Sequence, residues 1–146
     1  LIELIDYVIK TYEKIISKNN ISIKFNKTDN FKIIGDRDKL IEIFTNLIDN
    51  SIKYSDKNKE ITITAKKDGE FNTVSVADQG IGIPKESIHR ITERFFTVDP
   101  SKSRSVGGTG LGLAIVKHLV SQHRAEMDIN SVENEGTTID IKFNSL

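Results

Sequence analysis

The sequence contains no cysteine, which excludes disulfides and thiolate metal sites and fits a reducing compartment. It also has no excess of charge of either sign, because Lys and Arg together number 21 and Asp and Glu also number 21. Without a global field that attracts polyanions, we expect no nucleic-acid partner and no anionic membrane surface. The apolar runs fall far short of the roughly 20 residues that a transmembrane helix needs.

The 146 residues are enough for one domain with its own core. Hydrophobic residues at 37% and charged residues at 29% are ordinary for a globular protein. We therefore expect a single domain over residues 1–146. The chain begins at Leu1 without a signal-peptide pattern, so we expect a fragment whose natural start lies upstream.

Apolar periodicity predicts a mixture of helices and strands. Spacings of three and four predict helices over residues 1–18, about 38–55 and 111–122, and Pro84 suits the first turn of a short helix that reaches about Phe95. Alternation predicts strands over residues 21–25, 31–34, 61–67, 71–78, 126–131 and 137–143. Asp36 or Asp38 can cap the second long helix. The pattern predicts an α/β fold, a two-layer sandwich in which one mixed sheet carries helices on one face.

The helix over residues 38–55 has an apolar arc and a polar arc. Phe44, Leu47, Ile48 and Ile52 share one side, and Glu42, Asn46, Asn50 and Lys53 share the other. A polar arc is commonly just a solvated face. Asn is a poor helix former, however, and its amide oxygen is a hard ligand suited to Mg²⁺, while a Lys one turn beyond can neutralise phosphate.

Two glycine-rich segments follow. Residues 78–84 (DQGIGIP) leave a predicted strand; they form either a plain tight turn or a turn whose glycines let the backbone approach a flat ligand, with Asp78 accepting a purine amine. Residues 107–112 (GGTGLG) open a helix, and such turns bind phosphate through unpaired N–H groups. A dinucleotide fold needs a strand directly before these glycines, but the preceding residues 97–110 form a polar loop, which is usually functional or disordered.

In this order, the segments resemble the nucleotide-binding boxes of sensor histidine kinases. Residues 46–55 are similar to the N box, 78–84 to the G1 box, 93–99 to the F box and 108–113 to the G2 box. The resemblance covers essentially the whole chain, and residues 114–118 look most like the membrane-anchored phosphate-sensor type. It implies the Bergerat ATP-binding fold, shared with gyrase, Hsp90 and MutL, with a mobile ATP lid at about residues 97–110.

Carried over position by position, the resemblance implies ATP and Mg²⁺ as cofactors. It assigns Asn50 to the metal, and it assigns Asn46 and Lys53 to catalysis beside the phosphates. Asp78 would read the adenine amine, and Phe95 would pack between the lid and a helical hairpin. The nucleotide-binding positions that it implies besides Asn50 are Tyr54, Asp78, Gly80, Gly82, Ile83, Phe95, Lys102, Arg104, Gly108, Thr109, Gly110, Leu111 and Gly112.

Three positions depart from the family pattern. Thr92 stands where the F box commonly has Phe, and Thr97 stands where an Arg is frequent. Residues 123–125 (HRA) replace the usual glycine pair after the last helix. A non-glycine residue in a left-handed turn there costs about 1 kcal/mol, which affects stability rather than chemistry.

Three functions are compatible with these boxes: a histidine kinase catalytic domain, a hydrolytic ATPase of the same fold, and a nucleotide-binding module without chemistry. The hydrolases place a Glu general base one turn before the metal-binding Asn. Asn46 occupies that position here and cannot take a proton, which favours transfer of the γ-phosphoryl group to a histidine. The module alternative stays open, although every nucleotide box is present.

The family's phosphoacceptor is a His followed by an acidic residue, with a Pro five positions after the His. His89, His118 and His123 all lack this pattern. We therefore expect the acceptor hairpin to be absent from this chain. The resemblance implies two partners in two-component signalling: the dimerisation and phosphotransfer hairpin of the same kinase, and a response regulator receiver domain. We expect a monomeric fragment, a homodimeric full-length protein, and a cytoplasmic domain of a membrane-anchored bacterial sensor kinase.

Overall fold

A computed structural model describes residues 1–55, 58–101 and 108–146. Lys102 and Arg104, both predicted to bind nucleotide, lie outside the described residues, as does the middle of the predicted lid. The helices and strands are α1 (Ile2–Thr11), α2 (Glu13–Lys18), β1 (Ser22–Lys27), α3 (Arg37–Tyr54), β2 (Glu60–Asp68), β3 (Phe71–Asp78), η1 (Lys85–Arg90), α5 (Gly112–Gln122), β4 (Glu126–Val132) and β5 (Gly136–Asn144).

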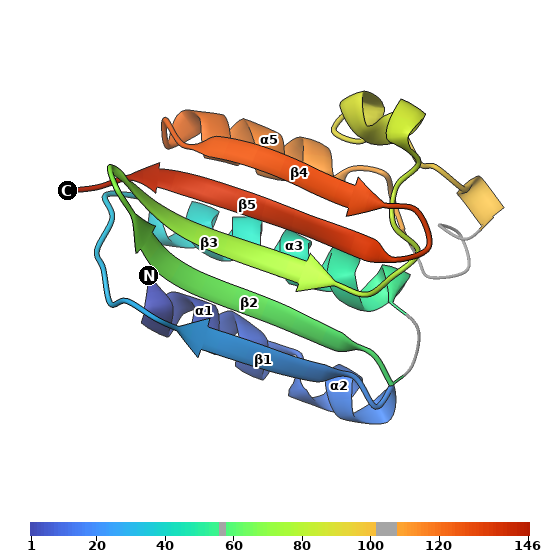
Figure 1. Cartoon of the computed structure of the whole chain (residues 1–146), viewed down its shortest axis with the longest axis horizontal. Coiled ribbons are helices and arrows are strands. Elements are labelled where there is room, and N and C mark those ends of the chain that lie inside the picture. The colour runs from blue at the N-terminus through green and yellow to red at the C-terminus, as the bar shows by residue number, and fades with distance from the viewer. Residues whose placement is uncertain (56–57, 102–107) are drawn as a thin grey trace.

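The described strands form one five-stranded sheet in the order β1-β2-β3-β5-β4. β1 and β2 are parallel, and every other pair is antiparallel. Figure 1 shows α1, α3 and α5 together behind the sheet, with α3 in the middle. The predicted two-layer α/β sandwich with a mixed sheet is therefore confirmed.

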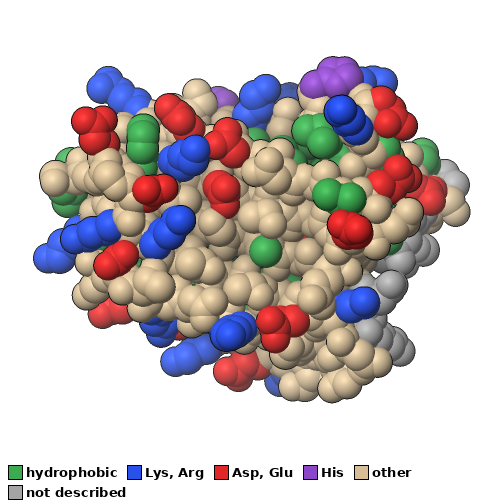
Figure 2. All heavy atoms as spheres, in the orientation of Figure 1, with side chains coloured by type: hydrophobic (Ala, Val, Ile, Leu, Met, Phe, Trp, Pro, Cys, Tyr) green, Lys and Arg blue, Asp and Glu red, His purple; other side chains and the backbone are tan. Residues whose placement is uncertain are grey.

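The core lies between the sheet and these helices. The predicted apolar arc of α3 is buried at all four positions, and Ile48 packs in the same cluster as Ile63 and Ile141. Asp36 caps α3 as predicted, because its carboxylate accepts a hydrogen bond from the Lys39 amide at 3.0 Å. No helix of the described residues covers the other face of the sheet, and Figure 2 shows that its centre is mainly uncharged, with most charged side chains toward its edges.

The predicted single helix over residues 1–18 is wrong, since the structure has two helices that meet at Tyr12. The Thr11 hydroxyl donates to the Val8 carbonyl oxygen at 2.7 Å. That oxygen is the acceptor that the Tyr12 amide would use in a continuous helix, and the Tyr12 amide donates to Ile9 instead. Such side-chain competition bends helices.

The predicted strand at residues 31–34 is also wrong. These residues belong to an irregular connection from the edge strand β1 to α3, and β1 pairs with β2 rather than with them. Phe31 is buried and Ile33 packs against the core, whereas Ile34 is 81% exposed. The apolar run therefore reflects packing at the edge of the core and not strand pairing.

The short helix predicted after Pro84 ends earlier than expected. It is the 3-10 helix η1, Pro84 lies just before it, and turns follow from residue 91. Phe95 has a left-handed backbone with φ of 64°, which no right-handed helix accommodates, and its amide donates to the Gly110 carbonyl oxygen at 2.8 Å. This bond ties the F-box segment to the turn before α5.

Candidate functional site

A pocket lies where the C-terminal half of α3, the end of β3, residues 91–99 and the start of α5 converge. Its apolar walls combine residues from all these segments and from β5: Leu47, Val76, Ile81, Ile83, Ile91, Phe96, Val98, Leu113 and Ile139. Its polar side chains include Asn46, Asp49, Asn50, Lys53, Tyr54, Asp78, Thr109 and Thr137. An apolar cleft with a few convergent polar groups is the usual form of a small-molecule site.

Asp78 ends β3 inside this pocket and is held by three donors. Its Oδ1 accepts the Gly80 amide at 2.9 Å and the Thr137 amide at 3.2 Å, and its Oδ2 accepts the Ser51 hydroxyl at 3.4 Å. Burial raises the pKa of the Asp78 carboxyl, and these hydrogen bonds oppose the rise. The result is a fixed, half-buried acceptor that suits a single amine donor such as that of adenine.

The turn after β3 is shaped by close backbone contacts. Gly82 has φ of 68°, and a side chain there would overlap the Val132 carbonyl group. The Ile81 amide donates to the Tyr54 carbonyl oxygen at 3.2 Å, and the Ile83 amide donates to the Ser131 hydroxyl at 2.8 Å. The turn is therefore joined both to the end of α3 and to β4, which fixes one wall of the pocket.

Asn46 and Asn50 face the start of α5. The Asn46 amide nitrogen donates to the Glu42 carbonyl oxygen at 2.9 Å, which leaves its oxygen directed away from that contact. A Cβ added at Gly112 would lie 3.3 Å from Asn46 Oδ1 and 3.5 Å from Asn50 Oδ1. Two neutral hard oxygens beside space that no side chain fills are a donor set that fits Mg²⁺, which keeps several waters and phosphate oxygens in its shell.

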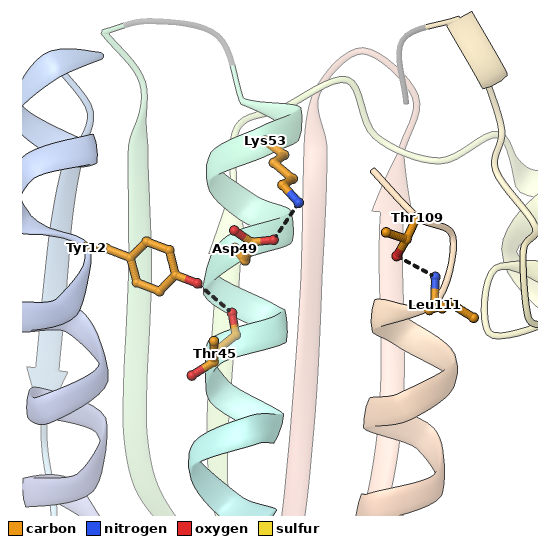
Figure 3. Close-up of polar contacts among 6 residues, drawn as sticks. All are labelled: Tyr12, Thr45, Asp49, Lys53, Thr109 and Leu111. Atoms are coloured by element: carbon orange, nitrogen blue, oxygen red, sulfur yellow. Dashed lines mark hydrogen bonds and ion pairs between the residues drawn. The ribbon is translucent and has the colours of Figure 1, made fainter. Parts of the chain in front are cut away.

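Lys53 and the turn before α5 complete the polar side of the pocket (Figure 3). The Lys53 ammonium forms an ion pair with Asp49 one turn earlier, at 2.9 Å. The Leu111 amide donates to the Thr109 hydroxyl at 3.3 Å just before α5 begins. The N-terminus of α5 points its amide dipoles at this end of the pocket, which favours an anionic ligand.

Most of the predicted site residues line one pocket, and a few do not. Those that line it are Asn46, Asn50, Lys53, Tyr54, Asp78, Gly82, Ile83, Gly108, Thr109, Gly110 and Gly112. Gly80 is buried under the pocket against the Tyr54 carbonyl, and Leu111 precedes α5 without facing the cavity. Phe95 is 73% exposed and reaches the pocket only through its backbone bond to Gly110.

The structure adds polar residues that the sequence did not single out. Thr137 lies opposite Asp78 in the pairing of β3 with β5, a register that local patterns do not reveal. Ser51 could have been predicted from the sequence, because it is a polar residue inside the buried arc of α3 and a buried hydroxyl needs a hydrogen-bond partner. The ion pair of Asp49 could also have been predicted, since Asp49 precedes Lys53 by one helical turn.

Residues 35–145 match the family described as histidine kinase-, DNA gyrase B- and HSP90-like ATPase. The chain belongs to this family. Two relatives are sensor kinases: the sensor-like histidine kinase SenX3 of Mycolicibacterium smegmatis, 34% identical over 96% of this chain, and the phosphate regulon sensor protein PhoR of Pseudomonas aeruginosa, 43% identical over 75%. The chain spans 36% of the first relative and 25% of the second.

A solved structure gives the same result for the fold. Histidine kinase ThkA, determined in complex with the response regulator protein TrrA, matches with a TM-score of 0.83 and 27% identity over 100% of this chain and 40% of that chain. The chain is thus an ATP-binding catalytic domain of the sensor histidine kinase type. No helix among its described residues is long and apolar enough to cross a membrane.

Proposed function

We propose that this domain binds Mg-ATP in the pocket and donates the γ-phosphoryl group to a histidine on a separate helical hairpin. The observation that carries the proposal is the polar face of α3, where Asn46 stands in place of the general base of the hydrolases. The carboxylate three positions further along this face, Asp49, forms an ion pair with Lys53 at 2.9 Å.

Each residue has a defined task in this proposal. Asp78 accepts the adenine amine, and Tyr54, Gly80, Gly82 and Ile83 enclose the base. Asn50 holds Mg²⁺, which neutralises phosphate charge when it is bound. Asn46 and Lys53 position the phosphates, and the amides at Gly108, Thr109, Gly110 and Gly112 bind them at the start of α5. Lys102 and Arg104 are the proposed cations of the lid, and Phe95 its contact with the hairpin.

Phosphoryl transfer needs positioning and charge neutralisation more than covalent help from the protein. The acceptor imidazole nitrogen bonds to the γ-phosphorus as the bond to the bridging oxygen breaks, and ADP leaves with the electron pair. The imidazole proton passes to the acidic residue that follows the acceptor histidine on the hairpin. Water is the competing nucleophile, and an amide at position 46 does not activate it.

The wider setting is proposed on the same basis. The partners are the dimerisation and phosphotransfer hairpin of the same kinase and a response regulator receiver domain. The similar kinase ThkA was determined in complex with the response regulator protein TrrA. In this proposal the isolated domain is monomeric and the full-length protein dimerises through the hairpin. The domain then works on the cytoplasmic side of a membrane-anchored sensor kinase.

The test uses γ-labelled ATP with the domain alone and with the helical hairpin of its parent kinase. The hairpin should acquire acid-labile, alkali-stable phosphate, and the domain should acquire none. His123 is a poor phosphoryl acceptor because both of its ring nitrogens already make hydrogen bonds. Its Nδ1 donates to the Leu119 carbonyl oxygen at 2.7 Å, and its Nε2 accepts a hydrogen bond from the Asp36 amide at 3.1 Å. Phosphohistidine on the domain itself would contradict the proposal, and release of free phosphate with an unlabelled hairpin would favour a hydrolase.

A further inference from the structure

Asp49 is an acidic residue in a pocket that is proposed to bind the negatively charged phosphates of ATP. It lines the same pocket as Asn50 and Lys53, and at neutral pH a carboxylate repels the phosphates of a nucleotide. The proposed function gives Asp49 no contact with the nucleotide. A charge that opposes ligand binding needs a compensating role, and its contacts on α3 indicate one.

The first contact is with Lys53. Asp49 Oδ2 lies 2.9 Å from Lys53 Nζ, and the two side chains are 34% and 29% exposed. The acidic residue precedes the lysine by four positions, which is the favourable order on a helix. A lysine side chain has about 2 kcal/mol of rotamer entropy to lose when it is ordered. An ion pair formed before nucleotide arrives removes part of that cost, and an ammonium has three donors, so one bond to Asp49 does not exclude bonds to phosphate.

The second contact comes from the N-terminal helices. Tyr12, at the junction of α1 and α2, reaches across to α3, where its hydroxyl makes a long hydrogen bond of 3.5 Å to the Thr45 carbonyl oxygen. Figure 3 shows the Tyr12 ring directed at the turn of α3 that carries Thr45 and Asp49. Burial raises the pKa of Tyr12 to about 12, and the charge of Asp49 and a hydrogen bond to it add to the rise. The phenol therefore stays protonated at neutral pH, and its one proton is shared between the Thr45 carbonyl oxygen and the Asp49 carboxylate.

We propose that Asp49 is a positioning residue that holds Lys53 toward the nucleotide phosphates, and that Tyr12 in turn holds Asp49. The proposal rests on the proposed function, because it takes Lys53 as a phosphate contact. It also gives the break at Tyr12 a consequence: the junction of the first two helices bears on the affinity of the pocket for ATP.

The rival role for Asp49 is simple repulsion of the ligand, and the two roles predict opposite signs. If Asp49 only repels phosphate, Asp49→Asn removes a negative charge and tightens Mg-ATP binding. If Asp49 positions Lys53, the same change removes one of the contacts that order the lysine and weakens binding. The expected loss is on the order of three- to fivefold in Kd, the size of a half-exposed ion pair.

The experiment is a double-mutant cycle read by calorimetry with Mg-ATP. Asp49→Asn, Lys53→Met and the double variant are compared with the unmodified domain. Lys53→Met should weaken binding, and adding Asp49→Asn to it should weaken binding no further, because Asp49 acts through Lys53. The matched control is Asp128→Asn, which removes the same charge and an ion pair with Lys142 far from the pocket, and should leave Kd unchanged. Tighter binding by Asp49→Asn, or an equal loss in both backgrounds, would overturn the proposal.

A second readout needs no nucleotide. The ¹³Cζ shift of Tyr12, followed by NMR against pH, should show that Asp49→Asn lowers the pKa of Tyr12 from about 12. Tyr12→Phe should weaken Mg-ATP binding in the same direction as Asp49→Asn, and Tyr7→Phe should not. An unchanged pKa of Tyr12 in a domain that still binds Mg-ATP would refute the role of Tyr12 and leave the proposed function intact. A lowered pKa in a domain that binds no Mg-ATP would refute the proposed function, and the role of Lys53 with it.

Discussion

The Asp78 carboxylate is placed to accept a hydrogen bond from the ligand, but the burial of its charge lowers the stability of the fold. Its carboxylate is the fixed acceptor at the end of β3, and burial raises the pKa of that carboxyl above its ordinary value. A buried acid with a raised pKa binds its proton more tightly in the folded state than in the unfolded state. Stability therefore falls as pH rises from about 3.8 through the raised pKa, and stays at the lower level above it.

Replacement of Asp78 by Asn should therefore separate ligand recognition from stability. Asn keeps an oxygen for the Gly80 and Thr137 amides but presents N–H groups where the carboxylate accepted, so the preference for ATP over GTP should fall on the order of tenfold or more. The free energy of unfolding at pH 7 should rise, and the gain should disappear below about pH 3.8. Competition binding and urea denaturation measure the two effects. Asp140→Asn, on the uncovered face of the sheet, is the control that should leave the preference for ATP over GTP unchanged.

Single residues also show which parts of the site can be predicted from the sequence. Helical periodicity places Asn46, Asn50 and Lys53 on one face, and the structure has all three in the pocket. Thr137 is 59 positions from Asp78, and only the register of β5 against β3 joins them. A site built from one helix is therefore predictable from local spacing, whereas a contact across strands needs the fold.

The end of α5 shows how an element ends without the usual glycine. Arg124 has φ of 52°, the left-handed geometry expected where the family has glycines. The Arg124 amide donates to the Ser121 carbonyl oxygen at 3.0 Å, and the Ala125 amide donates to the Val120 carbonyl oxygen at 3.1 Å. The turn therefore supplies hydrogen-bond donors to the last carbonyl groups of the helix. The hydrogen bonds of the turn are thus formed without glycine, but Arg124 keeps the backbone strain of a side chain in the left-handed region.

Two substitutions at Arg124 isolate that strain. Both Arg124→Gly and Arg124→Ala remove the side chain, but only glycine relieves the left-handed penalty. The glycine variant should be more stable than the alanine variant by about 1 kcal/mol. At Lys117, an exposed position within α5, the order should reverse, because glycine costs about 1 kcal/mol relative to alanine in a helix. Equal or greater stability of Arg124→Ala, measured by urea denaturation, would show that the turn carries no such strain.

The elements that the sequence failed to predict share a cause. Periodicity gave α3 and α5 to within a residue or so, because each has one face in the core. It missed the break at Tyr12, where a Thr11 hydroxyl takes a backbone acceptor, and the irregular residues 31–34, where Phe31 fills the edge of the core without a strand partner. In both places a tertiary or side-chain contact overrides a local pattern that looks regular.

At the scale of the whole molecule, one layer of helices leaves the pocket at one end of the sheet. The C-terminal end of β3, the last turns of α3 and the first turn of α5 meet there, so the topology brings together the residues that we propose to recognise the base, hold the metal and bind the phosphates. The opposite face of the sheet contributes no residue to this arrangement. The central claim is that this end of the molecule binds ATP through a metal on Asn50.

Calorimetry of ATP binding, with Mg²⁺ and with a chelator, tests that claim most directly. In the unmodified domain, removal of Mg²⁺ should weaken ATP binding on the order of tenfold or more, the size of one charge-assisted contact. Asn50→Ala should bind ATP equally in both conditions, at the weaker level, while Asn130→Ala on β4 should behave as the unmodified domain. The same Mg²⁺ dependence in Asn50→Ala as in the unmodified domain would contradict the account.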